Sequence, residues 1–167
     1  TRCRPVATIL VRHPPSPATG GQQGKSRMNR EPASFHDLHP TSDDLATDVL
    51  AGFSRAQKSI PPKYFYDAEG SRLFDAITEL PEYYPSRTET AMLIAYADEI
   101  ASKAGTGHLL VEPGSGSCTK ARILFEGLQP CAYVPMDISR DHLRVAAQEV
   151  AVEYPWLEVH AACTDFT

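Results

Sequence analysis

Acidic residues and glycines recur in the C-terminal half of the chain, each directly after a short apolar run. The run 109–111 leads into Glu112 and a Gly-Ser-Gly turn, and a second apolar run ends in Asp137, about 20 residues after the turn. Glycines let the backbone approach a ligand, a helix N-terminus faces that ligand, and an acid on the second strand accepts ribose hydroxyls. This spacing predicts a nucleotide-type cofactor site in a strand–helix–strand unit.

The residues of the turn narrow the choice of cofactor. A dinucleotide fingerprint needs a small residue three positions after its second glycine. Thr119 occupies that position after Gly114 and Gly116. No Gly-Lys-Ser/Thr motif follows, so nucleoside triphosphate hydrolysis has no support. A third apolar run ends at Asp165, and three successive strands that each end in an acid suit the ribose, adenine amino group and ammonium of S-adenosylmethionine.

Lysine and tyrosine side chains nearby offer further ligand contacts. Lys120 is expected in the first turn of a helix, where the helix dipole disfavours a cation unless an anion such as a cofactor carboxylate lies nearby. Tyr83 and Tyr84 stand between two prolines that stiffen the backbone, and each has an apolar ring with a donor at its tip. A solvated lysine and packed tyrosines are the alternatives. No residue is assigned as catalytic, histidines included.

Strand and helix patterns alternate around these residues. Apolar periodicity predicts strands over 108–112, 132–137 and 157–163, with intervening helices over 117–128 and 140–153. Such alternation indicates an α/β fold with a parallel sheet and right-handed crossovers. We expect a Rossmann-like sheet that is truncated after about three strands and whose last strand presents an unpaired hydrophobic edge.

The N-terminal part of the chain divides into two regions of different character. Residues 1–40 are rich in Pro and Gly and lack periodicity, which predicts a disordered segment. Residues 41–104 carry helical patterns, and Ser86 with Glu89 forms a capping box at the start of the last helix. We expect this helical region to contribute to the substrate site. Residues 105–167 are then the first, incomplete half of a cofactor-binding domain.

Composition and charge limit the possible partners. An apolar content of 42% and a charged content of 22% are typical of globular proteins. The net charge is −5, but residues 1–30 contain six basic residues and no acid, so the remainder is near −11. An anionic body of this kind argues against nucleic-acid binding. No apolar run approaches the roughly 20 residues that cross a bilayer, so we expect no membrane association.

The four cysteines have neither the spacing nor the paired histidines of a zinc site, and no metal is expected. They are Cys3, Cys118, Cys131 and Cys163. Those beside predicted strands and helices are expected to be buried, reduced thiols. A cytoplasmic location follows as the expectation.

Four blocks of the sequence together resemble one protein family. They are PPKYFYDAEGSRLFDAITELPEYYPSRTE, VEPGSGSCTKARILFEGL, YVPMDIS and DF. These blocks resemble the histidine-specific S-adenosylmethionine-dependent methyltransferases, whose best-known members make trimethylhistidine for ergothioneine biosynthesis. The resemblance extends from about Leu45 to Phe166, and the blocks around the two tyrosines are far more specific than the glycine turn.

The resemblance implies a class I methyltransferase fold and methylation of the α-amino group of histidine. The family's cofactor-binding positions match Gly114, Lys120, Asp137, Asp165 and Phe166, to which the turn adds Gly116, and its histidine-contacting tyrosine matches Tyr83. Pro113 and Cys118 depart from the leucine and serine of typical ergothioneine-pathway members. The family's remaining strands and substrate contacts would lie beyond Thr167, so the chain alone is expected to be inactive.

Three alternatives stay open. A methyltransferase of the same family could act on another amino acid or amine, and a non-catalytic fragment could retain the sheet without activity. A nicotinamide-dependent oxidoreductase is disfavoured by Thr119. In the enzyme interpretations the partner is a small molecule, and the oligomeric state is not assigned.

Overall fold

The computed structural model describes residues 9–11, 33–38 and 45–165. Its strands are β1 (Ile9–Val11), β2 (Ser34–Asp37), β3 (Leu109–Pro113), β4 (Ala132–Asp137) and β5 (Glu158–Cys163). Its helices are α1 (Leu45–Phe53), α2 (Ala68–Thr78), α3 (Tyr84–Ala104), α4 (Thr119–Leu128) and α5 (Arg140–Glu153), with a 3₁₀ turn, η1 (Pro62–Phe65), before α2. The strands form one sheet in the order β1-β3-β4-β5-β2, in which only the β1–β3 pair is antiparallel.

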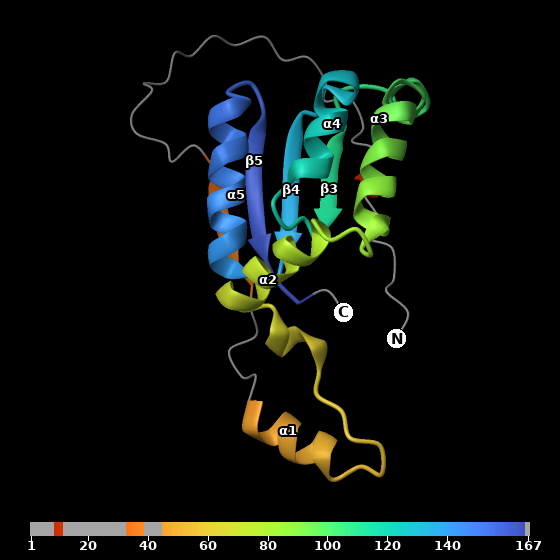
Figure 1. Cartoon of the computed structure of the whole chain (residues 1–167). Coiled ribbons are helices and arrows are strands. Elements are labelled where there is room, and N and C mark those ends of the chain that lie inside the picture. The colour runs from red at the N-terminus through yellow and green to blue at the C-terminus, as the bar shows by residue number, and fades with distance from the viewer. Residues whose placement is uncertain (1–8, 12–32, 39–44, 166–167) are drawn as a thin grey trace.

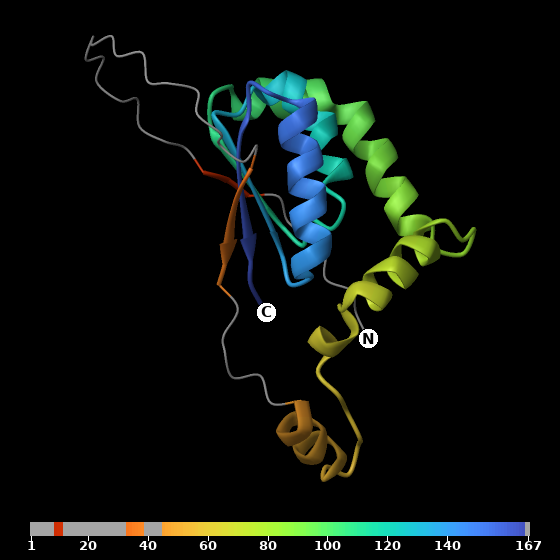
Figure 2. The ribbon, with the colours of Figure 1, turned by 90° about the vertical axis from the view of Figure 1, so that its left-hand side faces the viewer.

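Helices α3, α4 and α5 lie on the same side of this sheet (Figure 2). Residues along β3 and β4 alternate between buried and half-buried, as expected when one face of a strand packs on a core. Tyr133 of β4 is fully buried, and the Phe125 ring of α4 meets it edge-on with centroids 5.1 Å apart. Leu143 and Val150 of α5 are also fully buried. The core therefore lies between the sheet and these helices.

The α/β prediction is confirmed, and most element limits agree closely. The bounds of β4 and α5 are those that the apolar periodicity predicts, and β3 and β5 differ from prediction by one residue at their ends. Helix α4 begins two residues late because Cys118 has a left-handed backbone with φ of 57°. Pro113 is the last residue of β3.

Strand β2 corrects two expectations. The prediction of disorder over residues 1–40 is wrong for residues 33–38, where β2 pairs in parallel with β5, and β1 likewise joins the sheet. The expected unpaired edge of β5 is therefore covered. The Ser34 hydroxyl also contacts His160 of β5 at 2.5 Å. Two further contacts join β2 to α5: the Phe35 ring with the Arg144 guanidinium (4.5 Å) and the Asp37 carboxylate with Arg140 (3.1 Å). The rest of 1–40 lies outside the described residues.

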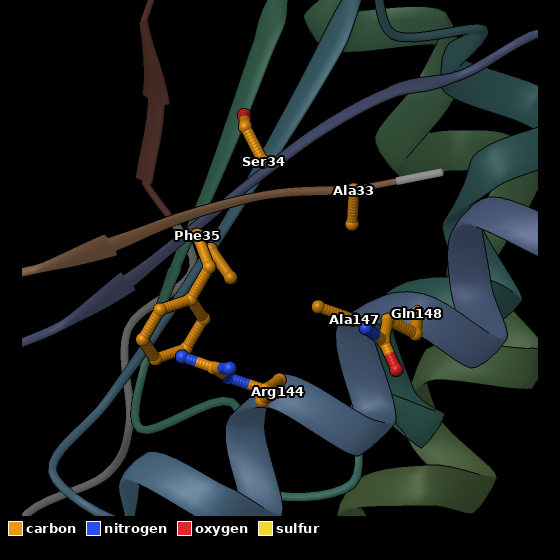
Figure 3. A pocket seen from close by; sticks show the side chains of 7 residues that line it. Ala33, Ser34, Phe35, Arg144, Ala147 and Gln148 are labelled. Carbon is orange, nitrogen blue, oxygen red and sulfur yellow. The ribbon is translucent and has the colours of Figure 1, made fainter. Parts of the chain in front are cut away.

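A small cavity lies between β2 and α5 (Figure 3). Ala33 and Phe35 point toward Arg144 and Ala147, and the cavity volume is about 150 Å³. Small-molecule sites typically occupy roughly 300–1,000 Å³. We therefore interpret this cavity as a packing gap between strand and helix.

The N-terminal helical region meets the sheet at one end. Helix α2 contacts α3 and α5, and α3 and α4 run side by side in the same direction (Figure 1). Their packing is close, because a Cβ added to Gly127 of α4 would lie 2.9 Å from the Ala101 Cβ of α3. Several large apolar side chains of this region stay substantially exposed: Leu50, Phe53, Leu73, Phe74 and Ile77.

The described cysteines are all free thiols. Cys118 and Cys163 are buried as expected, whereas Cys131 is exposed, so its expected burial is wrong. Among the helices of the described segments, none has the length and apolar character required to cross a bilayer.

We expect β2 to stabilise the sheet by covering the outer edge of β5. Two truncated chains, beginning at residue 33 and at residue 41, differ only in the segment that carries β2. The shorter chain should unfold at lower urea concentration and should self-associate, because an uncovered apolar edge strand pairs readily with other chains. Urea denaturation and size-exclusion chromatography of the two chains would measure both effects. Equal stability and equal elution would contradict a structural role for β2.

Candidate functional site

The predicted cofactor residues that the structure describes lie at or just after the carboxyl ends of β3, β4 and β5, apart from Lys120 in the first turn of α4. The N-termini of α3 and α4 point to the same end of the sheet, and α2 lies close to it (Figure 1). In open α/β sheets, ligands bind in the crevice outside the carboxyl ends of the strands. The fold thus brings the predicted residues to the end of the sheet where ligands of such folds bind.

The Gly-Ser-Gly turn is fixed to the neighbouring strand. The backbone N–H groups of Gly114 and Ser115 both donate to the Met136 carbonyl, at 2.7 and 3.0 Å. Gly116 has a φ of 49°, and a Cβ added there would meet no atom within 4 Å. The buried Ser115 hydroxyl has no hydrogen-bond partner among the described residues. A pinned backbone with open space beside it and an unused hydroxyl fits a turn that receives a ligand.

Asp137 is buried at the end of β4, and backbone amides hold both of its carboxylate oxygens. Gly116 donates its N–H to Oδ2 at 3.0 Å, and Ser139 donates its N–H to Oδ1 at 2.9 Å. Each carboxylate oxygen keeps a further acceptor site after these bonds. The carboxylate is therefore oriented in advance, with capacity left for two ribose hydroxyls.

Glu112, one residue before the end of β3, lies in a similarly dry environment. It is only 4% exposed, and the Tyr133 hydroxyl donates to its Oε2. Burial raises the pKa of the Glu112 carboxyl to about 7, although the Tyr133 hydrogen bond and the Lys120 charge oppose the shift. Burial also raises the pKa of the Tyr133 hydroxyl, which stays a donor. At neutral pH, Glu112 is thus present in both charged and neutral forms.

Cys118 stands immediately before α4 and is fully buried. Its φ of 57° lies in the left-handed region, and its N–H donates to the Ser115 carbonyl at 2.8 Å. Burial raises the pKa of the thiol to about 11. The thiol is therefore protonated at neutral pH, which suits a packing role beside the glycine turn.

Lys120 lies in the first turn of α4, as predicted, but its partner was not foreseen. The ammonium Nζ donates to Oε2 of Glu89 on α3 at 2.5 Å. The sequence predicts Glu89 as half of a capping box with Ser86, and this is wrong because α3 begins earlier, at Tyr84. The sequence pattern could not reveal this role, because a glutamate at this position is compatible both with a capping box and with an ion pair to Lys120.

Tyr83 immediately precedes α3 and is half-buried. Its ring meets Phe74 edge-on with centroids 5.9 Å apart, and its N–H donates to the Leu80 carbonyl at 3.1 Å. Arg87 clamps the same loop, because its guanidinium donates to the carbonyls of Leu80 and Pro81, both at 2.7 Å. Tyr84, the alternative tyrosine, is exposed. The loop that carries Tyr83 is thus held by its own helix.

Asp165 follows β5, and the residue before it, Thr164, donates its N–H to the Asp137 carbonyl at 3.0 Å. Phe166 lies outside the described residues. The sequence also gave no signal for Ser71 of α2, whose buried hydroxyl lies 2.8 Å from that of Ser139. This contact joins the helical region to the loop that orients Asp137.

The charges around the turn indicate the kind of ligand that fits. Glu89 pairs with Lys120, and the Glu112 carboxyl lies close enough to Lys120, Glu89 and Asp137 for their charges to act on it. A pyrophosphate would be repelled by these acids, whereas a ligand with ribose hydroxyls, cationic groups and one carboxylate is complementary to them. The described residues therefore fit S-adenosylmethionine better than a dinucleotide, and no metal-binding cluster occurs among them.

We expect Glu112 to make stability depend on pH. Its pKa rises from 4.5 to about 7 on folding, so the folded protein binds more protons within this window and the free energy of unfolding falls as the pH rises. A shift of this size corresponds to roughly 3 kcal/mol. Glu112→Gln stays neutral and can still accept from Tyr133, so its stability should not show this fall.

Urea denaturation between about pH 5 and about pH 8 would measure the effect as the difference between variant and wild type. Taking this difference cancels the contributions of the other titrating groups, which the two proteins share. Glu126→Gln, an exposed change on α4, is the matched control and should follow the wild type. Parallel pH profiles for wild type and Glu112→Gln would contradict the raised pKa.

Known proteins provide an independent comparison. A family described as histidine-specific, S-adenosylmethionine-dependent methyltransferases matches residues 45–167. The chain is 45% identical over 138 residues to histidine N-alpha-methyltransferase of Mycolicibacterium smegmatis, covering 80% of this chain and 43% of the relative. It is 44% identical over 126 residues to the Mycobacterium tuberculosis enzyme of the same name, covering 73% of this chain and 39% of the relative.

A more distant relative carries a different name. The 4-dimethylallyltryptophan N-methyltransferase of Claviceps purpurea is 27% identical over 112 residues, which cover 65% of this chain and 33% of the relative. The chain thus spans less than half the length of each of these three relatives. The family match includes the glycine turn, the three strand-end acids and the helices before them. The chain belongs to the histidine-specific, S-adenosylmethionine-dependent methyltransferase family.

Proposed function

We propose that the protein transfers methyl groups from S-adenosylmethionine to the α-amino group of histidine. The observation that carries the cofactor assignment is the Asp137 carboxylate, which two backbone amides hold at the end of β4 beside the glycine turn. The substrate assignment rests on the two bacterial relatives, which are named histidine N-alpha-methyltransferases. Family membership supports both assignments.

Each site residue is assigned a role, from its surroundings or from its resemblance to a family position. Asp137 accepts the ribose hydroxyls, and Gly114 and Gly116 let the cofactor lie close to the main chain. The Lys120 ammonium faces the cofactor carboxylate. Asp165 and Phe166 complete the adenosine side of the site by their resemblance to family positions. Tyr83 orients the amino acid that accepts the methyl group.

The cofactor supplies an activated methyl group on a sulfonium centre when it is bound. The leaving sulfur needs no protonation, so the residues of the chain mainly align the acceptor amine and exclude water. The dry strand ends around Glu112 and Asp137 suit this task. The free thiols of the described cysteines support the expectation of a reducing, cytoplasmic setting.

Asp137→Ala should weaken binding of S-adenosylhomocysteine at least about tenfold, because hydrogen bonds to a charged group contribute roughly 1.5–3 kcal/mol each. The change also frees the amides of Gly116 and Ser139, so the turn loses an anchor. Asp137→Asn retains one acceptor oxygen and should have an intermediate affinity. Isothermal titration calorimetry measures all three proteins, and unchanged affinity in the alanine variant would remove Asp137 from the site.

Histidine should be the preferred methyl acceptor when the catalytic apparatus is complete. Methyl transfer depends on alignment, and a misplacement of about 1 Å can cost on the order of a hundredfold in rate. We therefore expect the 167-residue chain to be inactive alone and active when the C-terminal part of the Mycolicibacterium smegmatis relative is fused after Thr167. Mass spectrometry of reactions with histidine, tryptophan and 4-dimethylallyltryptophan would identify the acceptor.

Cys131→Ser, an exposed change, is the matched control and should leave turnover unaltered, while Asp137→Ala should reduce it. Methylation of the tryptophan compounds in place of histidine would favour the alternative function, a methyltransferase of the same family that acts on another amino acid. The Claviceps purpurea relative, named a 4-dimethylallyltryptophan N-methyltransferase, points to this alternative. Comparable turnover by the 167-residue chain alone would show that these residues contain the whole catalytic apparatus.

A further inference from the structure

Glu89 is a carboxylate at the cofactor end of the sheet for which the proposed function gives no role. Its Oε2 accepts a hydrogen bond from Lys120 Nζ at 2.5 Å, and this contact joins α3 to α4 across 31 residues of sequence. The side chains are 44% and 33% exposed, so both are partly shielded from solvent. Glu89 thus contacts directly the cation that faces the cofactor.

Lys120 needs such a partner to stay in place. The first turn of a helix carries the positive end of the dipole, which repels an ammonium group. A lysine side chain also has many rotamers, and it loses this freedom when it is held in one position. Lys120 affects the Glu112 carboxyl electrostatically, so the ammonium lies near two acids from different elements. A carboxylate at Glu89 offsets the dipole and selects one position for the ammonium.

Contacts at both ends of α3 fix the helix, and with it the position of Glu89. Ala101 packs tightly against Gly127 at the far end of the helix pair, and Arg87 fixes the loop before α3 through the carbonyls of Leu80 and Pro81. Tyr83 lies at the start of the same helix, six residues before Glu89, which corresponds to about 9 Å along the axis. The same helix therefore carries the acceptor-side tyrosine and the partner of the cofactor-side lysine.

We propose that Glu89 is a positioning residue that holds the Lys120 ammonium where the amino-acid carboxylate of the cofactor binds. This inference rests on the proposed function, because it assumes the same cofactor. Glu89 acts through Lys120 and leaves the ribose and adenine contacts unchanged. Its effect is therefore confined to ligands that carry the amino-acid carboxylate.

The test compares two ligands in calorimetric titrations of the protein. S-adenosylhomocysteine contains the amino-acid carboxylate, whereas 5′-methylthioadenosine has the same nucleoside without it. Glu89→Gln keeps the shape of the side chain and removes its charge, so S-adenosylhomocysteine should bind about three- to tenfold more weakly, as a charge-assisted bond is replaced by a neutral one. Binding of 5′-methylthioadenosine should stay within about twofold of wild type.

Two further variants separate positioning from general damage. Glu99→Gln breaks the ion pair with Lys103 on the same helix, away from the site, and should bind both ligands like the wild type. In a Lys120→Met background, Glu89→Gln should have no further effect, because its action passes through the lysine. Equal weakening of both ligands, tighter binding of S-adenosylhomocysteine, or an undiminished effect without Lys120 would overturn the inference. Failure of the wild type to bind S-adenosylhomocysteine would instead overturn the proposed cofactor and this inference with it.

Discussion

Two carboxylates that are removed from water at the end of a parallel sheet constrain the rest of the site. A buried acid is costly unless donors surround it, and each of the two finds donors on a neighbouring element. Asp137 takes amides from the glycine turn and from the loop before α5, whereas Glu112 takes the Tyr133 hydroxyl from the adjacent strand. Satisfying these acids fixes β3, β4 and the turn relative to one another.

The helical region before the sheet connects to this framework through side chains. The hydroxyls of Ser71 and Ser139 link α2 to the loop that orients Asp137, and Glu89 links α3 to Lys120. Both connections reach the cofactor end of the sheet, so changes in the helical region act on the same residues that would hold the cofactor. These two contacts couple the helical region to the end of the sheet where the predicted cofactor residues lie.

Local patterns explain which parts could be predicted from the sequence. The limits of β4 and α5 follow from apolar periodicity within each segment, and the glycine turn with Asp137 follows from spacing along one crossover. Strand β2 could not be found in this way, because its ladder is formed with β5, more than a hundred residues away. A four-residue parallel strand has little periodicity of its own.

Other contacts could not be predicted because the same residue type can either cap a helix or contact another element. Glu89 matches a capping box, but its carboxylate pairs with a lysine that only the packing of α3 on α4 brings near. Ser139 occupies the N-cap position of α5, yet its hydroxyl meets Ser71 and makes no capping bond. Side chains with several possible partners need the tertiary arrangement to decide between them.

The backbone at Cys118 limits which residues evolution can place at the mouth of the site. A left-handed φ of 57° is strained for side chains branched at Cβ, and complete burial leaves little room for larger ones. Threonine and valine are therefore unfavourable here, whereas serine and cysteine are small and unbranched. A serine at this position would keep the turn's shape while replacing the thiol by a more polar hydroxyl. Substitutions at this position should therefore change the polarity of the side chain while leaving its size nearly constant.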